Sequence, residues 1–440
     1  MKKKLLCALL TGAMVLSAGS AVLADEAESE TSNVNEDGSV NDPSKVEVDE
    51  NKLVMWSLFT GGDGEYMTKI IDDYNATSPS KQVQSITLVW ADYYTKLQTA
   101  VAADKGPDVG LSHVSKLPEL VDQGVVEPLN DYLDELGVDL SSMYTQNSLD
   151  SVTFDGEIYA IPLDTHAEVM YYNKDILEKA GIELNADGKL DIGSLDDFKA
   201  MLDKVKAVMG DGESPIALTN TGDDPYRVWW AYFQMGGTPI VNDDGTEVTL
   251  DTDKAVEAAE FVKSLYDDGY VATGIDDHQK LFQSGKAGFL FGGTWAVGVM
   301  ESTDGLNFNV QSFPQLFDED HCWADSHTFI LPVNGDRDED ETKAAVEFMV
   351  AACKDGGLTW AGSGQIPANT EVTGNEEYAA LPYRSNYQDE VEKAVLPTKN
   401  PHFYAMKDGM IQSLDTIWTG TNDAATGIDA LVDELSSNLE

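Results

Sequence analysis

Positive charge is scarce in this chain of 440 residues. It carries 28 Lys and Arg against 78 Asp and Glu, which gives a formal net charge of -50. Because phosphate groups are bound by clustered cations, this balance argues against nucleic acid and anionic lipid headgroups as partners. Such a surplus of carboxylates is typical of a solvated, self-repelling surface that keeps a protein soluble. The alternative interpretation of this negative charge is a cation-binding function.

Cysteine is also scarce, with residues only at Cys7, Cys322 and Cys353. No metal-ligand spacing surrounds Cys322 or Cys353, so we predict neither a metal site nor a cofactor. A disulfide between these two could form in an oxidising compartment. Because Cys353 ends an apolar helical pattern, a small buried thiol is the alternative.

Recognisable catalytic motifs are missing as well. The sequence contains no nucleophile elbow, no zinc-binding helix and no Cys/His set. With 78 carboxylates, acidic pairs at any separation arise by chance and give no support to a glycosidase. We therefore predict that the chain is not an enzyme, and a secreted glycoside hydrolase is the weaker alternative.

The apolar run from Leu5 to Leu16 follows three lysines and is too short to cross a bilayer. This pattern predicts a signal peptide over residues 1–24, and hence an exported protein that is extracellular, on the cell surface or periplasmic. Ser20 stands where a lipid-bearing cysteine is possible, so we do not expect a lipid anchor. Residues 25–50 are rich in Asp, Glu, Ser and Asn, which predicts a disordered acidic tether.

After residue 50, short apolar stretches alternate with amphipathic ones. Strands are predicted at residues 52–56, 85–90 and 108–111, with helices at residues 93–103 and 116–123. This alternation predicts an α/β fold of mostly parallel sheets covered by helices on both faces. At this length we expect two lobes.

In open sheets of this kind, ligands bind beyond the carboxyl ends of the strands. That rule selects the turn from Trp56 to Asp63, together with Trp90 and His113. The stretch Tyr226–Tyr232 is denser in aromatic residues than packing requires, so one face of this helix is predicted to reach the ligand. For each aromatic residue, packing in the core is the alternative.

The stretch Glu157–Asp175 changes character within a few residues. An apolar strand ends at Pro162, whose ring lacks an N–H and crowds the preceding residue. A polar segment with Asp164 and Thr165 follows, and the sequence then returns to β-favouring residues. We predict that the chain leaves one sheet and enters another at this point.

The run YAIPLDTHAEVMYYNKDIL, from Tyr159 to Leu177, resembles the first hinge of bacterial extracellular solute-binding proteins. It is similar to the maltose-binding-protein-like group, which feeds sugars to ATP-driven importers. Three further runs strengthen the resemblance: Pro107–Leu129, Gly285–Val297 and Gly362–Val372.

The resemblance implies a two-lobed periplasmic-binding-protein type II fold. It assigns residues 51–164 plus 313–367 to the N-terminal lobe and residues 165–312 plus 368–440 to the C-terminal lobe. Further hinge crossings are expected at Val310–Pro314 and at Gln365–Pro367. The implied function is that of the substrate-binding component of an ABC transporter. It would be a monomer that captures a carbohydrate, such as an oligosaccharide, between its lobes and delivers it to the permease subunits in the membrane.

A sugar presents C–H faces and a rim of hydroxyls, so aromatic plates and short polar groups are the matching side chains. The resemblance implies that the strand ending in Gly292 and Gly293 lets its backbone approach the ligand. It also implies that the tryptophan that follows, Trp295, stacks on a sugar ring. The alternative is a protein of the same fold for a non-sugar solute such as a polyamine, which needs carboxylates clustered beside the aromatics. The predicted binding residues are Trp56, Phe59, Gly61, Asp63, Trp90, His113, Asp164, Thr165, Trp229, Trp230, Gly293, Thr294, Trp295 and Gln365.

Overall fold

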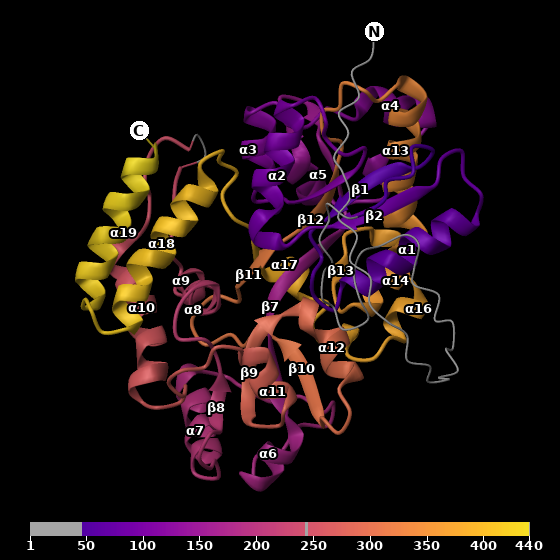
Figure 1. Cartoon of the computed structure of the whole chain (residues 1–440). Coiled ribbons are helices and arrows are strands. Elements are labelled where there is room, and N and C mark those ends of the chain that lie inside the picture. Colours follow the sequence, from indigo (N-terminus) through magenta and orange to yellow (C-terminus); the bar gives the residue numbers. More distant parts are fainter. Residues whose placement is uncertain (1–45, 243–244, 440) are drawn as a thin grey trace, which may run out of the picture. The chain divides into compact units, whose positions relative to one another are not determined.

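The computed structural model of the chain describes residues 46–242 and 245–439. The predicted signal peptide, Ser20 and most of the predicted tether lie outside the described residues. Strand β7 (Asp164–Asn173) is central to the architecture, because it begins next to one sheet and runs through the middle of another (Figure 1).

The first group of strands contains two small sheets. Strand β12 (His327–Ile330) lies between β3 (Gly110–His113) and β6 (Ala160–Pro162) and is antiparallel to both. Strands β1 (Leu53–Ser57) and β2 (Val83–Thr87) form a parallel pair, and a bridge from Met55 to Val109 links this pair to the segment before β3. The helices beside these strands are α1 (Gly64–Ala76), α2 (Trp90–Ala102), α3 (Leu117–Asp122), α4 (Asn130–Leu136), α5 (Gln146–Val152), α13 (Glu339–Lys354) and α14 (Gly357–Gly362).

These elements bury one continuous set of apolar side chains, which we call the N-terminal core. It includes Met55, Leu111, Ile161, Phe329 and Phe348, all of which are fully buried. Burial of this kind supplies most of the favourable free energy of folding, at about 25 cal/mol for each Å² of apolar surface removed from water. Helix α13 enters the core in a defined register, because Asp338 and Glu341 form a reciprocal capping box at its first turn.

The second sheet is built around β7. Strand β7 is antiparallel to β9 (Ala287–Gly293) and β10 (Phe308–Ser312), and β9 is parallel to β8 (Ser214–Ala217). The first residues of β7 also pair with β11 (Cys322–Asp325) and β13 (Ile366–Pro367), and β14 (Ala394–Val395) pairs with β11.

Helices cover both faces of this sheet. Met170 and Tyr172 of β7 belong to the larger apolar cluster, the C-terminal core, while Val169 and Tyr171 pack into a smaller cluster. Such double burial explains the nearly continuous apolar sequence of β7. The longer helices are α6 (Lys174–Lys179), α7 (Leu195–Lys206), α8 (Asp223–Trp229), α10 (Thr252–Asp267), α11 (His278–Gln283), α12 (Val297–Ser302), α18 (Phe403–Trp418) and α19 (Ala424–Leu439).

Shorter elements complete the described chain. They are β4 (Thr153–Phe154), β5 (Glu157–Ile158), α9 (Ala231–Gln234), α15 (Thr370–Thr373), α16 (Glu376–Ala379), α17 (Glu390–Lys393), η2 (Leu140–Ser142), η3 (Thr294–Ala296) and η4 (Arg384–Asn386).

The sheets confirm the predicted α/β class, but they are mixed rather than mostly parallel. Only the pairs β1–β2, β8–β9 and β11–β14 are parallel among the paired strands of the described residues. The alternation of strands and helices predicted crossover connections correctly near the N-terminus. That alternation could not reveal that β7 and β12 run antiparallel to the strands beside them.

Within the described residues, three segments of chain connect the two groups of strands. The first is Leu163, between β6 and β7, where the sequence predicts the first crossing. The last leads from α14 to β13, which pairs with Asp164 and Thr165. The second was expected at Val310–Pro314, but β10 still pairs with β7 there, and Phe313 lies in the C-terminal core. The chain returns to the N-terminal core at Ser326, between β11 and β12.

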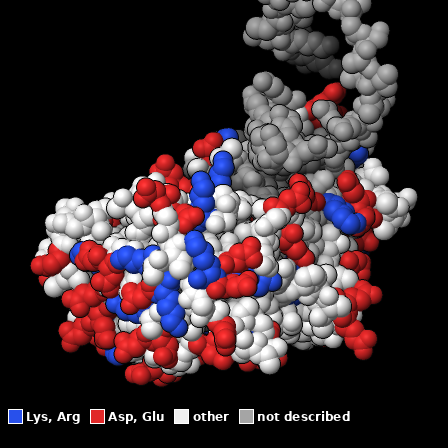
Figure 2. Space-filling model, turned by 90° about the horizontal axis from the view of Figure 1, so that it is seen from below, with Lys and Arg blue, Asp and Glu red and all other residues white. Residues whose placement is uncertain are grey.

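Two further features bear on the sequence predictions. Cys322 is buried in the C-terminal core and Cys353 in the N-terminal core, and both are free thiols. Of the helices in the described ranges, none combines the length and hydropathy that a bilayer crossing requires. On the face shown in Figure 2, Asp and Glu are widespread and a band of Lys and Arg runs among them.

Candidate functional site

A cavity of about 370 Å³ lies where residues of the two cores face each other. From the N-terminal side come the turn after β1, Trp90 at the start of α2 and His113 at the end of β3. From the other side come residues of β7, α8, α11, η3, α12, β11 and α18. The residues that line it are Leu58, Phe59, Thr60, Gly61, Gly62, Asp63, Trp90, His113, His166, Asp223, Arg227, Gln279, Trp295, Val299, Trp323, Asp325, His327, Tyr404 and Lys407.

The turn after β1 is shaped by close packing. A Cβ at Gly62 would lie 2.1 Å from a methyl carbon of Val299, so only glycine allows this backbone to approach α12. Asp63 follows and is 8% exposed. Burial raises the pKa of Asp63 to about 6, although the neighbouring charge of His327 opposes this shift. The turn therefore presents a carboxyl group that accepts or donates a hydrogen bond near neutral pH.

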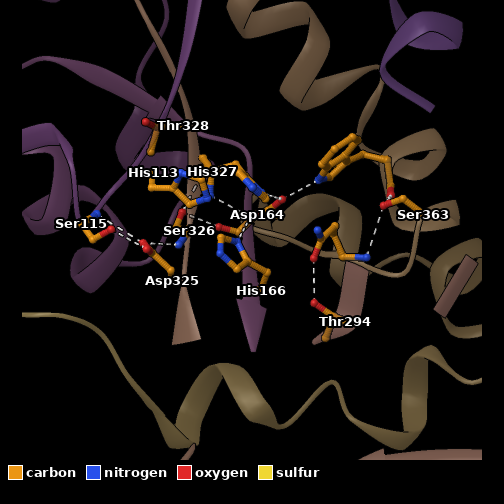
Figure 3. Close-up of polar contacts among 12 residues, drawn as sticks. His113, Ser115, Asp164, His166, Thr294, Asp325, Ser326, His327, Thr328 and Ser363 are labelled. Carbon is orange, nitrogen blue, oxygen red and sulfur yellow. Dashed lines mark hydrogen bonds and ion pairs between the residues drawn. The ribbon is translucent and has the colours of Figure 1, made fainter. Parts of the chain in front are cut away.

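Three histidines from different elements form one wall of the cavity (Figure 3). His166 lies on β7, His327 on β12 and His113 on β3, and one ring nitrogen of each lies within 4.8 Å of those of the other two. The ring centroids of His166 and His327 are 4.2 Å apart. We call these residues the histidine cluster.

Asp164 lies directly behind this cluster and is fully buried. Its carboxylate accepts hydrogen bonds from His327 Nδ1 at 2.8 Å and from Trp360 Nε1 at 2.8 Å, and His166 Nδ1 lies 3.3 Å away. Burial alone would raise the pKa of Asp164, but the facing histidines hold it below its usual range. The same carboxylate raises the pKa of His327 against the opposing effect of burial. Asp164 therefore fixes the orientation of two cluster rings.

The other two rings of the wall favour neutral imidazole. Burial, with the nearby charge of His327, lowers the pKa of His166 and holds that of His113 well below its ordinary value. His113 Nδ1 lies 2.8 Å from the hydroxyl of Tyr94. At neutral pH these rings are uncharged and able to offer a lone pair.

Arg227 of α8 lines the cavity between two tryptophans. Its guanidinium carbon lies 5.2 Å from the ring centre of Trp295 and 5.4 Å from that of Trp323. Its Nε donates to Glu168 at 2.9 Å, and Asp224 pairs with it from the same helix. Burial raises the pKa of Glu168 to about 7, and the charge of Arg227 limits that shift. The arginine thus holds two indole rings in fixed positions beside the cavity.

Six of the predicted binding residues line the cavity, namely Phe59, Gly61, Asp63, Trp90, His113 and Trp295. Trp90 is 41% exposed, which makes it an accessible flat surface at the start of α2. Two further predicted residues, Asp164 and Thr165, lie behind the lining. Asp164 contacts the histidine cluster, and Thr165 is the next residue of β7.

The remaining predicted residues lie elsewhere. Trp229 and Trp230 were expected as stacking plates, but both are buried in the C-terminal core, where the Trp229 indole donates to the carbonyl of Ala255. The helix does reach the cavity, through Asp223 and Arg227, which are four residues apart and share a face. The prediction was right about the helix and wrong about which face of it.

Trp56, Gly293, Thr294 and Gln365 also lie outside the cavity lining. Trp56 packs against the N-terminal core and is only partly buried, since β1 alternates its side chains and the fully buried positions are its neighbours. The hydroxyl of Thr294 donates to Gln365 at 2.7 Å, and both residues are fully buried. This hydrogen bond ties η3 to the segment that leads into β13.

Several cavity residues escaped the sequence analysis, among them His166, Arg227, Trp323, His327 and Lys407. A signal was present for two of them, since Trp323 and His327 flank the polar pair Asp325-Ser326 in an otherwise apolar stretch. Polar residues at the junction of two strands are a general indication of a site beyond a strand end. The others carry no local signal, because only tertiary contacts bring them together.

The fold and the cavity define a two-core solute-binding protein. The family described as bacterial extracellular solute-binding protein matches residues 69–385, so the chain belongs to this family and is an exported protein. A family that binds solutes is not one of enzymes, which agrees with the prediction made from the missing catalytic motifs.

Particular relatives are distant. A binding protein of Brucella abortus is 29% identical over 265 residues, which is 58% of this chain and 61% of the relative's length. Among solved structures, UgpB from Mycobacterium tuberculosis in complex with glycerophosphocholine has a TM-score of 0.77 at 18% identity, covering 89% of this chain and 99% of that one. Maltose-bound MalE3 of T. maritima has a TM-score of 0.74 at 21% identity, covering 88% and 99%. At such identities the likeness establishes the shared fold.

Proposed function

We propose that this chain is the substrate-binding component of an ABC importer and that it captures a carbohydrate in the cavity between its cores. The observation that carries the proposal is the lining of that cavity. Indole rings at Trp90, Trp295 and Trp323 are combined there with the short polar groups of Asp63 and Asp325. Flat apolar surfaces match the C–H faces of a sugar, and carboxylates accept from its hydroxyls.

The size of the cavity supports a small oligosaccharide rather than a long chain. Its volume of about 370 Å³ falls at the lower end of the range for small-molecule sites. MalE3, which shares the fold, is bound to maltose. The captured sugar would then be handed to permease subunits in the membrane, the partner expected for a protein of this family.

The test is a thermal-shift screen of the protein against a panel of neutral mono- and oligosaccharides, followed by calorimetry on the compounds that stabilise it. A sugar present at one hundred times its dissociation constant should add about 2.7 kcal/mol to the free energy of unfolding. Trp90→Ala should weaken the binding of that sugar and leave the melting temperature without ligand unchanged, because Trp90 is exposed. The proposal fails if no sugar in the panel stabilises the protein.

A second candidate is a solute that carries a cationic headgroup. Asp63, Asp223 and Asp325 all line the cavity beside tryptophans, and this combination suits an alkylated ammonium group. UgpB, of the same fold, is in complex with glycerophosphocholine. Including glycerophosphocholine, choline and spermidine in the same screen separates the two candidates, since stabilisation by these compounds alone would favour the cationic solute.

A further inference from the structure

The histidine cluster has a feature that solute capture by itself does not require. His113, His166 and His327 are separated by long stretches of sequence, yet one ring nitrogen of each lies within 4.8 Å of the others. All three rings line the cavity, and their centroids are 4.2 to 5.5 Å apart. Three imidazoles that meet at a solvent-accessible cavity are a typical donor set for a transition-metal ion.

The hydrogen bonds behind the rings strengthen this interpretation. Nδ1 of His327 and Nδ1 of His166 face the two oxygens of Asp164, and Nδ1 of His113 faces the hydroxyl of Tyr94 (Figure 3). Metal-binding histidines commonly engage their second ring nitrogen with a carboxylate or another polar group, which sets the tautomer and orients the ring. Within the described ranges, no hydrogen bond is made by the Nε2 atom of any of the three.

Burial of Asp164 adds a second argument. This carboxylate is fully buried, and a buried anion is costly unless nearby positive charge compensates for it. A single protonated histidine would satisfy it, but that arrangement accounts for only one of the three rings. A divalent ion held on the far side of the rings would compensate the carboxylate through two of them at once.

We propose that His113, His166 and His327 bind a divalent transition-metal ion of the zinc class through their Nε2 atoms, with Asp164 and Tyr94 as positioning residues. This site goes beyond the proposed capture of a sugar, which needs no metal. Three protein ligands leave a fourth position that faces the cavity, where a water molecule or a polar group of the solute completes the coordination.

Metal binding requires a small contraction of the cluster. Tetrahedral zinc with Zn–N distances of about 2.0–2.1 Å places its ligand nitrogens about 3.4 Å apart. One ring nitrogen of each histidine lies within 4.8 Å of the others, so the rings must move closer, and the 30° angle between His166 and His327 must open.

The test is titration of the purified, untagged protein with Co²⁺, whose visible absorption reports tetrahedral nitrogen coordination, followed by displacement with Zn²⁺. Excess Mg²⁺ is present throughout, because the chain carries a net charge of -50 and its carboxylates bind divalent ions weakly. Imidazole sites prefer zinc-class ions, whereas Mg²⁺ prefers oxygen ligands. We expect binding of one ion per chain that Mg²⁺ does not remove.

Variants locate the ion. His166→Gln and, separately, His113→Gln should abolish the Co²⁺ spectrum, and Tyr94→Phe should weaken binding by about 10-fold while keeping the spectrum. His402→Gln is the matched control, because His402 is exposed and lies outside the cluster. Melting curves in a chelator show which variants remain folded, and Tyr94→Phe keeps the test valid if both histidine variants unfold.

The proposal is overturned if the protein gives no tetrahedral Co²⁺ spectrum, or if Mg²⁺ removes the bound ion. It is also overturned if folded cluster variants bind Co²⁺ as tightly as the control. Each of these results leaves the proposed sugar binding untouched, since the thermal-shift screen can be repeated in the presence of a chelator and does not depend on a bound ion.

Discussion

The indole of Trp295 lies directly against Gly293. A Cβ built at residue 293 would be 1.8 Å from Cζ3 of that ring, so no residue other than glycine allows Trp295 its observed position. The sequence analysis explained the glycine by the approach of a ligand to the backbone. The structure gives a different reason, because the glycine makes room for the indole, and the indole in turn lines the cavity.

Gly293→Ala should therefore displace the Trp295 ring. The backbone of Gly293 is extended, with φ -87 and ψ 167, so alanine meets no conformational penalty and the effect is purely one of packing. We expect a loss of about 1–3 kcal/mol in the free energy of unfolding and a change in tryptophan fluorescence. Gly292→Ala is the control, because the atoms nearest to a Cβ there belong to Leu290 and lie at an ordinary contact distance of 3.5 Å or more. Equal effects of the two substitutions would contradict this account.

Trp295 and Trp229 should respond in opposite ways to replacement by alanine. Trp295 is partly exposed beside the cavity, and Trp229 is fully buried in the C-terminal core. Trp295→Ala should weaken sugar binding by roughly 1–3 kcal/mol, by analogy with the stacking of bases on aromatic side chains. Trp229→Ala should cost about 3–5 kcal/mol of folding stability. Calorimetric titration and urea unfolding of both variants measure the two quantities, and a Trp295→Ala protein that binds normally but unfolds early would refute the stacking role.

Glu390 should make folding stability depend on pH. It is fully buried, with one oxygen accepting from the backbone N–H of Phe313 at 2.6 Å and the other without a partner. Burial raises its pKa to about 7 from an ordinary 4.5, although the thiol of Cys322 and the charge of Lys393 oppose the shift. The folded state thus favours the protonated acid. Its contribution is fully present below about pH 4.5 and is lost as the pH rises through 7, by about 3 kcal/mol in all.

Glu390→Gln removes that titration and keeps the acceptor oxygen. The free energy of unfolding of the variant, relative to the original protein, should therefore increase between pH 5 and pH 8. Glu392→Gln serves as the control, since Glu392 is exposed on the same helix. Parallel stability curves for all three proteins across this range would show that Glu390 does not carry the pH dependence.

Solute binding should bring the two cores closer together. The chain connects them at Leu163, at Ser326 and at the segment leading into β13, and the cavity is lined from both sides. A ligand that contacts both sides favours the closed arrangement by its extra contacts there. Small-angle scattering should show a smaller radius of gyration with a stabilising solute than with a compound that gives no thermal shift. An unchanged radius at saturation would count against closure.

The sequence predicted those parts of the fold that depend on local patterns. Pro162 ends β6, and the polar residues after it mark the passage into β7, so the first crossing was found correctly. The second was misplaced, because Phe308, Val310 and Phe313 form an apolar stretch that reads equally well as a strand or as the approach to a hinge. Only the pairing of β10 with β7 distinguishes them.

The site was predicted less completely for a related reason. Residues that follow a strand directly, such as Asp63 and His113, could be found from chain order. It is harder to predict from sequence which face of a helix points toward a cavity. Arg227 lines the cavity and Trp229 is buried in the core, although only two positions separate them. The histidine cluster as a set could not be predicted, because its members come from three strands that are far apart along the chain, and only His113 was selected from the sequence.

Asp164 directly follows the first connection between the cores, accepts a hydrogen bond from His327 just after the second, and pairs with Pro367 at the third. All three connections therefore lie next to one residue, which contacts the second through its carboxylate and the third through its backbone. A rotation of one core relative to the other that changed one connection would also change the contacts of the other two, so the three connections must rotate together. The two cores are then expected to move along a single well-defined path, set by one buried residue and its neighbours.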